Sequence, residues 1–449
     1  MKSPISMAKH GLLAVLLGIL FPVSAQVLLL KADGSSTLPL RITRYGNPWI
    51  QREASVFRTQ LTPEYQKVDL PAARSSQEVW MLNLPEESAQ VYLGVGDTLY
   101  MQYSEVSGWL FESGNAAALN QRLTAIDRLC DNVLVQAGAN KSQPLVKQVR
   151  QFADTVLNAP ARFGGEFEQG YLKFRVALTE ISTESRSRKA LIQKYFTSSP
   201  QPANPAWMES FHQLFGGVLQ QELIRDRSDS LKTAIAKVQT DSIQHYFSRR
   251  FPEWLTEIRD LTVVLGLYRE GFRKGTSRDL IIRNLDRLQL NGSEYVKQFV
   301  ADIQEDWMRY QKGAQMPSFT YTSQGKNLNS ESLLNKPLYL AYYPDFDLDV
   351  QRELLMLKAM FAKYKSGISF LVVVNTNNEA QLSKVVAETQ PGFDVVALSR
   401  CSDAFLRYPE REDTRTYLLL EAGGLVFQAP AEGPETGVDA AFLGLMKKR

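Results

Sequence analysis

A chain of 449 residues is longer than one ordinary hydrophobic core requires, so the sequence predicts two or three domains. Lysine and arginine number 51 against 48 aspartate and glutamate residues, and no basic block stands out, which makes nucleic acid and anionic membranes poor candidate partners. With only two cysteines, Cys130 and Cys401, the chain is not a disulfide-dense scaffold.

The first 25 residues have the pattern of a secretion signal. Lys2 and Lys9 form a basic start, residues 11–21 are apolar but too few to span a bilayer, and residues 23–25 are typical of a cleavage site. We therefore expect cleavage before Gln26 and an exported chain with no transmembrane segment left after cleavage. No cysteine follows the apolar stretch, so a lipid anchor there is not expected.

Residues 26–114 have the pattern of short β-strands. Three segments are rich in Val, Leu, Tyr and Trp and are bounded by turn residues: 79–84, 89–95 and 97–103. Alternation places Val91, Leu93 and Val95 on one face, as a half-buried antiparallel strand requires. This region is predicted to be a small β-sandwich.

From residue 115 to residue 310 the apolar period becomes helical. Six residues fall on one helical stripe: Leu123, Ile126, Leu129, Cys130, Val133 and Leu134. Four later segments repeat the pattern: 191–196, 230–247, 279–290 and 294–310. Pro200, Pro202 and Pro205 interrupt it as a loop. We expect an all-helical domain, and no fixed-period repeat suggests a solenoid.

Residues 311–449 are predicted to form an α/β domain, which makes the whole chain a multi-domain α+β protein. Residues 311–336 are its polar linker and N-terminal hairpin. A strand at 337–343, a helix at 345–365 and a strand at 368–375 form a βαβ unit. The remaining elements follow in order: a helix at 379–389, a strand at 393–399, a hairpin at 416–428 turning at Gly423 and Gly424, and a helix at 440–448.

Several motifs of this domain follow the order of a known family. They are Gly313, Pro317 and Phe319 in a Gly-x-x-x-Pro-x-Phe pattern, a hairpin at Gly325, the aromatic pair 342–343, the Arg-Glu-Leu run 352–354, and the strand 415–421 with Gly424. On these residues the domain resembles the TlpA-like branch of the thioredoxin superfamily. Residues 94–103 and 111–123 are similar to the β-domain that precedes such modules in exported proteins of the Bacteroidetes type. The resemblance implies a location in the periplasm or cell envelope of a Gram-negative bacterium.

The relatives that this resemblance implies are thiol-disulfide oxidoreductases, but the chain departs from them at the redox site. Their two active-site cysteines align with Asp347 and Val350, and their cis-proline aligns with Arg415. Exchange requires a thiolate at the helix N-terminus, so no catalytic residue, cofactor or metal is expected there. A cis bond before Arg415 would cost about 3 kcal/mol, so we expect a trans bond. Arg415 either forms an ion pair with Asp347 or Asp349, or is an exposed residue that contributes little.

Three aspartates, Asp345, Asp347 and Asp349, resemble the start of a calcium loop. An EF-hand is excluded because Val350 and Met356 stand where glycine and an acid are needed. Two interpretations remain: helix capping, worth about 0.5 to 2 kcal/mol, or another divalent-ion site.

The cysteines and histidines suggest little other chemistry. Cys130 is expected to be a buried, inert thiol, whereas Cys401 lies in a predicted loop and is the alternative reactive thiol. A disulfide between them would require two domains to approach closely. His212 and His245 stand beside aromatic residues and form neither a metal cluster nor a triad, and no phosphate loop or hydrolase motif is present.

Two functional hypotheses follow. The first is a non-enzymatic binding or scaffold protein whose pseudo-thioredoxin domain contacts a protein partner that no motif identifies, in an oligomeric state that no motif specifies. The second is a thiol-disulfide or peroxide-linked enzyme that uses Cys401 with an external thiol. A ligand pocket in the helical domain is a third possibility, for which the sequence offers no polar constellation.

Overall fold

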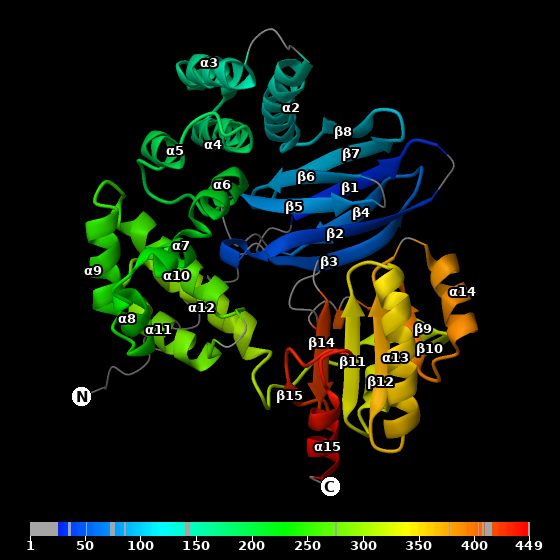
Figure 1. Ribbon diagram of the computed structural model, residues 1–449. Helices are drawn as coiled ribbons and strands as arrows, with labels where there is room; N and C mark the ends of the chain where they lie inside the picture. The colour runs from blue at the N-terminus through cyan, green and yellow to red at the C-terminus, as the bar shows by residue number, and fades with distance from the viewer. Residues whose placement is uncertain are drawn as a thin grey trace, which may run out of the picture.

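The computed structural model describes residues 26–447 apart from 35–36, 51, 72–76, 85–86, 140–143, 274–275, 377, 403, 406–407 and 409–414. The expected secretion signal, residues 1–25, lies outside the described residues. Within the described part of the chain, no helix is both long enough and apolar enough to cross a membrane. Figure 1 shows strands at the N-terminal end, helices in the middle and a mixed α/β layer at the C-terminal end.

Two four-stranded sheets form the N-terminal region, in the orders β4-β1-β7-β8 and β3-β2-β5-β6. Their strands are β1 (Gln26–Ala32), β2 (Leu38–Asn47), β3 (Arg52–Leu61), β4 (Gln66–Leu70), β5 (Glu78–Asn83), β6 (Ser88–Leu93), β7 (Thr98–Ser104) and β8 (Gly108–Ser113). Alternate residues of both sheets, such as Leu28 of β1 and Ile42 of β2, are fully buried in one shared core. This is the arrangement of a β-sandwich.

The alternation expected for residues 89–95 ends early. Strand β6 stops at Leu93, and Val95 lies in the next turn with 55% of its surface exposed. The turn forms because the Asp97 carboxylate accepts the Gly94 N–H at 2.6 Å. Tyr92, on the opposite face to Leu93, is buried as well because its ring packs against Tyr171 of the helical region at 5.6 Å.

In the described part of the middle region, the regular elements are helices. Its α-helices are α2 (Ala117–Ala139), α3 (Leu145–Leu157), α4 (Glu166–Ser182), α5 (Arg188–Tyr195), α6 (Pro205–Phe215), α7 (Val218–Arg225), α8 (Ser230–Ala236), α9 (Thr240–Arg250), α10 (Thr256–Glu270), α11 (Arg278–Asn291) and α12 (Glu294–Met308). The segment 230–247 is not one helix, because Val238 adopts a left-handed φ of +56° between α8 and α9. Pro205 does not belong to a loop: it opens α6 directly after the N-cap Asn204, a position that tolerates proline.

The short 3-10 helix η1 (Pro48–Ile50) joins the sandwich to the helical region. Trp49 stacks on Phe299 of α12 at 5.1 Å and meets Trp207 of α6 edge to face at 6.1 Å. Its carbonyl oxygen lies 2.8 Å from Nε2 of His212. One continuous hydrophobic core therefore includes residues from both regions. His212 contributes a polar contact with the backbone of Trp49 at this junction.

The C-terminal region is built around a five-stranded sheet in the order β13-β12-β11-β14-β15. Its elements are β9 (Thr320–Ser323), β10 (Lys326–Asn329), η3 (Ser330–Leu333), β11 (Leu338–Tyr343), α13 (Leu348–Tyr364), β12 (Ser369–Val374), α14 (Glu379–Thr389), β13 (Asp394–Ala397), η4 (Leu398–Arg400), β14 (Thr416–Leu420), β15 (Val426–Gln428) and α15 (Asp439–Lys447). Strands β11, β12 and β13 run parallel, whereas β14 pairs antiparallel with β11 and places its first residue opposite the end of β11.

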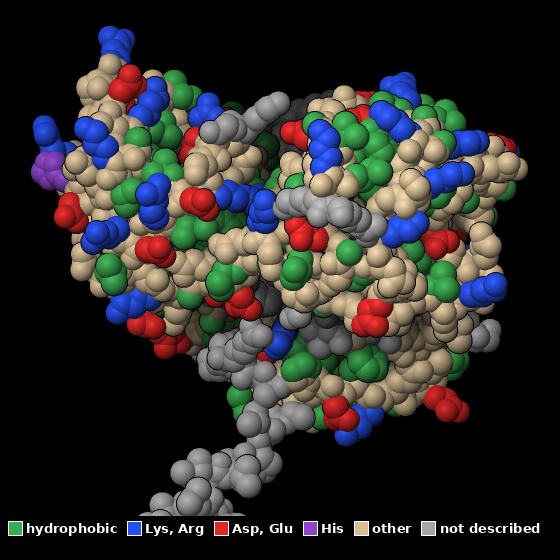
Figure 2. Space-filling view, turned by 90° about the horizontal axis from the view of Figure 1, so that it is seen from below, with side chains coloured by type: hydrophobic (Ala, Val, Ile, Leu, Met, Phe, Trp, Pro, Cys, Tyr) green, Lys and Arg blue, Asp and Glu red, His purple; other side chains and the backbone are tan. Residues whose placement is uncertain are grey.

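The two faces of this sheet have separate cores. Helices α13, α14 and α15 supply side chains such as Leu354 and Phe442 to one face, and Figure 1 shows α13 in front of the sheet, running roughly along its strands. Phe319 and Tyr321, from the segment that contains the expected hairpin at Gly325, are buried on the other face. On the surface seen in Figure 2, basic and acidic side chains are interspersed, in keeping with their near balance in the sequence.

Candidate functional site

The N-terminus of α13 is closed by an aspartate. Asp347 has extended backbone angles, and its Oδ1 accepts the N–H of Val350 at 2.8 Å. This hydrogen bond, followed by the nearby Arg415, holds the pKa of Asp347 below its usual value. The predicted capping role of Asp347 is confirmed, and Val350 is fully buried beneath it.

Arg415 directly precedes β14, so the pairing of β14 with β11 brings its side chain to the start of α13. Its Nη2 lies 2.9 Å from Oδ2 of Asp347 and 3.7 Å from Oδ2 of Asp349. Its Nη1 lies 2.9 Å from Oε1 of Glu353. Of the two alternatives for Arg415, the structure therefore shows the ion pair, and Arg415 meets three carboxylates instead of Asp347 or Asp349 alone. Thr414 is outside the described residues, so the trans bond expected before Arg415 stays a prediction.

Glu353 is the member of this cluster that sequence reasoning missed. Its side chain is only 6% exposed, and its Oε2 accepts hydrogen bonds from Tyr343 at 2.8 Å and Tyr417 at 2.6 Å. Burial, the neighbouring phenol and the Glu353 carboxylate raise the pKa of Tyr343, so it remains a donor at neutral pH. One indication was available: Glu353 follows Asp349 by four residues, which puts both acids on the same side of the helix.

These contacts leave the cluster without an evident reactive group. The Asp347 carboxylate is held by a backbone N–H and an arginine, and Glu353 is held by an arginine and two phenols. Among the described residues, no group of three or more His, Cys, Asp or Glu side chains is arranged to hold a metal ion. The geometry is that of a saturated ion-pair and hydrogen-bond network.

Both cysteines are buried, in different cores, and neither forms a disulfide. Cys130 of α2 is 1% exposed, and burial raises its pKa to about 11. Cys401 is 4% exposed, with its Sγ 3.9 Å from the carbonyl oxygen of Ala397 and its backbone bridged to Tyr321. Cys401 was expected in a loop, and the structure places it just after η4 with its side chain buried. A thiol so enclosed is poorly placed to react.

No family model and no curated protein matches the chain. A thiol:disulfide interchange protein from Bacteroides sp. is similar in structure, with 14% identity and a TM-score of 0.27 over 31% of this chain and 93% of its own. The thioredoxin domain of a thiol-disulfide oxidoreductase from Bacteroides vulgatus has 14% identity and a TM-score of 0.25, over 31% of this chain and 97% of its own. A thioredoxin-like protein from Bacteroides caccae has 11% identity and a TM-score of 0.36, over 56% of this chain and 95% of its own. Identities and TM-scores this low transfer neither a fold assignment nor an activity to this chain.

Proposed function

We propose that this chain is an exported, non-catalytic binding or scaffold protein of the bacterial cell envelope, whose C-terminal domain keeps a thioredoxin-like fold without thiol chemistry. One observation carries the proposal: at the N-terminus of α13, where a dithiol enzyme needs a thiolate, the cap is the carboxylate of Asp347 paired with Arg415. A carboxylate cannot attack a disulfide to form the mixed disulfide through which exchange proceeds. In this proposal Asp347, Val350 and Arg415 are the degenerate redox positions.

The arrangement around Arg415 supports a structural use of the former site. Glu353 is buried, and a buried carboxylate is tolerated only when it is paired and hydrogen-bonded. Arg415, Tyr343 and Tyr417 together meet that need. The same side chain therefore stabilises the junction of β11, β14 and α13 instead of presenting a substrate.

The competing hypothesis, an enzyme that works through Cys401, lacks comparable support. Attack by an external thiol or peroxide requires an accessible thiolate, and Cys401 is 4% exposed. The other cysteine of the chain, Cys130, is buried in the separate core of the helical region and forms no disulfide with Cys401. No observation of the site favours this second function.

Reduction of insulin by purified residues 26–449 in the presence of dithiothreitol tests the proposal. We expect the rate to equal that of dithiothreitol alone, with a thioredoxin as positive control and a Cys401→Ser variant as matched control. Turnover that disappears in Cys401→Ser would refute the non-catalytic function and favour the alternative. The binding role is tested separately by crosslinking the native envelope through the exposed lysines of α13, Lys358 and Lys363; we expect one reproducible neighbour, and its absence would contradict a scaffold role.

A further inference from the structure

A pocket in the helical region lies far from the α13 cluster and is not used by the function proposed above. It opens between α5, α7, the end of α9 and the turn that follows α9, and its volume is about 330 Å³. Part of its wall is apolar and consists of Ile192, Val218, Phe251 and Trp254. Phe251 and Trp254 are stacked with ring centroids 4.0 Å apart, so they present a joined aromatic surface. The size falls at the lower end of the range for small-molecule sites.

The charged part of the wall has an excess of positive side chains. Four basic residues line the pocket, against the two acids Glu222 and Glu253: Arg188, Lys189, Arg225 and Arg250. Glu222 is buried and shared, because its two oxygens lie 3.2 Å from Arg225 and 3.0 Å from Arg250. Glu253 lies 3.8 Å from Lys189, a long distance for an ion pair. The pocket is therefore left with a net positive field.

Arg188 has no ion-pair partner among the residues that the structure describes. Its Nη1 donates to Oε1 of Gln221 at 3.2 Å and its Nη2 donates to the carbonyl oxygen of Leu214. Its Nε is buried without a hydrogen-bond partner, which is energetically unfavourable for a polar group. Burial and the neighbouring Arg225 both lower the pKa of Arg188, as expected of a cation that lacks a nearby anion.

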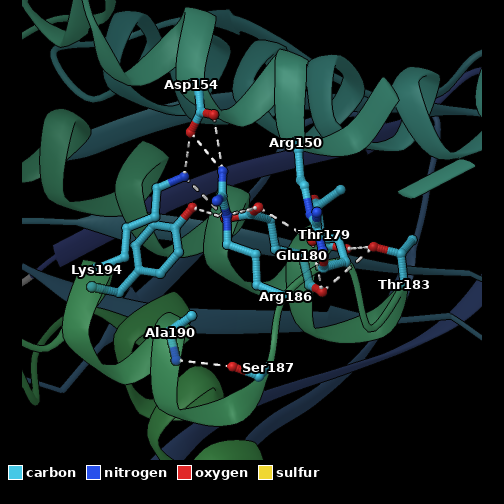
Figure 3. A network of polar contacts seen from close by, with 11 residues as sticks. Arg150, Asp154, Thr179, Glu180, Thr183, Arg186, Ser187, Ala190 and Lys194 are labelled. Carbon is cyan, nitrogen blue, oxygen red and sulfur yellow. Dashed lines mark hydrogen bonds and ion pairs between the residues drawn. The ribbon is translucent and has the colours of Figure 1, made fainter. Parts of the chain in front are cut away.

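The chain that carries Arg188 is held in place by the polar network in Figure 3. Arg186, two residues earlier, donates from Nε to the fully buried Glu180 at 2.7 Å. Ser187 caps α5, because its Oγ accepts the N–H of Ala190 at 3.3 Å. The backbone at Arg188 is thus fixed before any ligand arrives, which reduces the entropy cost of binding.

We propose that this pocket binds a small organic anion, with a carboxylate or phosphate head held by Arg188 and Lys189 and an apolar body against Phe251 and Trp254. A guanidinium with an unused donor suits a planar carboxylate or a phosphate oxygen. The stacked aromatic pair gives the apolar half of the ligand a surface on which it can be buried away from water. This site is independent of the α13 cluster, so either proposal can fail without the other.

Isothermal titration of purified residues 26–449 with five probes tests the site. Phenyl phosphate and phenylacetate carry the head and body, 2-phenylethanol lacks the charge, phenethylamine reverses it, and inorganic phosphate lacks the body. We expect at least one of the two aromatic anions to bind with a Kd below about 10 mM. The neutral probe, the cationic probe and inorganic phosphate should each bind at least tenfold more weakly, a difference of about 1.4 kcal/mol in binding free energy. Which anion binds more tightly distinguishes a carboxylate ligand from a phosphate ester.

Two variants and one control locate the binding. Arg188→Gln and Lys189→Gln should each raise the Kd about tenfold or more, whereas Arg287→Gln, an exposed change on α11 outside the pocket, should leave it unchanged. Lys189 is 69% exposed, so its replacement keeps the fold even if that of Arg188 does not, and circular dichroism checks both. The proposal is overturned if neither aromatic anion binds, if 2-phenylethanol or inorganic phosphate binds equally well, or if the folded Lys189→Gln variant binds like the wild type.

Discussion

Replacing Arg415 with alanine removes a cation from the buried Glu353 carboxylate. Breaking a fully buried ion pair costs about 3 to 5 kcal/mol. Here the cost is smaller because the Arg415 side chain is 33% exposed and Glu353 keeps the hydroxyl donors of Tyr343 and Tyr417. We therefore expect Arg415→Ala to lower the local stability around α13 by about 1 to 3 kcal/mol.

Double-mutant cycles separate the partners of Arg415. The coupling between Arg415 and Glu353, measured with Glu353→Gln, should exceed about 1 kcal/mol because Glu353 is 6% exposed. The coupling with Asp347, which is 49% exposed, should fall in the range of about 0.2 to 1 kcal/mol found for exposed pairs. Arg352→Ala is the matched control: Arg352 is 71% exposed and lies 3.6 Å from Asp349, so its effect should stay within about 0.5 kcal/mol.

The assay must report on the C-terminal region alone. All six tryptophans precede residue 311, so tryptophan fluorescence does not report there. Hydrogen exchange read by mass spectrometry on peptides from β11, α13 and β14 gives the free energy of local opening in the intact chain. Peptides from β1 and β7 serve as internal controls and should not change.

A definite result would contradict this reasoning. If Arg415→Ala leaves the exchange of α13 and β14 unchanged, then the contact with Glu353 contributes no stability and the structural use of the site is wrong. If the coupling energy of Arg415 with Asp347 exceeds that with Glu353, then burial of the carboxylate does not set the strength of these ion pairs.

Four further outcomes are expected. Ellman's reagent should label Cys130 and Cys401 slowly until the chain is denatured, since a rise in the pKa of Cys130 from 9.0 to about 11 lowers its thiolate fraction about a hundredfold; fast native labelling would contradict the buried positions. With both replaced by serine, Asp347→Cys and Val350→Cys together should oxidise to an intramolecular disulfide, because a first helical turn places such Cα atoms within about 4.4 to 6.8 Å; a reduced product would mean that the redox positions are misassigned. Asp347 contributes stability above its unfolded pKa that is lost as pH falls through its lowered folded pKa, so local opening of α13 should become easier below about pH 4, and less so in Asp347→Asn, which keeps the cap. N-terminal sequencing of the exported protein should begin at Gln26, and an intact or lipidated terminus would refute the secretion signal.

The elements of the C-terminal region follow closely from local pattern. The helix expected at 379–389 is α14 (Glu379–Thr389), and the turn expected at Gly423 and Gly424 has both glycines at φ +88°. Apolar runs bounded by glycine and proline mark such elements because burial and backbone freedom are set within a few residues. The ion pair of Arg415 was likewise accessible, since the order of strands in a known fold brings residue 415 to the start of the helix.

Other features depend on contacts that no local pattern contains. In the sequence, Glu353 was only part of the Arg-Glu-Leu motif that aligns the domain with the family it resembles. Its role in the cluster could not be predicted, because its partners Tyr343 and Tyr417 lie on two different strands. The break between α8 and α9 depends on Val238 adopting a left-handed conformation, which a β-branched residue rarely does and which apolar periodicity does not predict. The basic pocket brings together residues from 188 to 254 whose individual charges are unremarkable in sequence.

Under the non-catalytic function proposed above, the electrostatics at the N-terminus of α13 explain how a carboxylate can stand where a thiol enzyme has its thiolate. A helix N-terminus stabilises a negative charge, and in a thiol enzyme that charge is a thiolate whose protonation controls reactivity. Asp347 supplies the same charge permanently, because its lowered pKa keeps it ionised at neutral pH. Arg415 then balances the charge of the Asp347 carboxylate, which takes no part in thiol chemistry in this proposal. Under that proposal the helix N-terminus keeps a negative charge whose contacts hold β11, β14 and α13 together. Placing cysteines at Asp347 and Val350 without removing Arg415 should then give an intramolecular disulfide that exchanges slowly with other thiols.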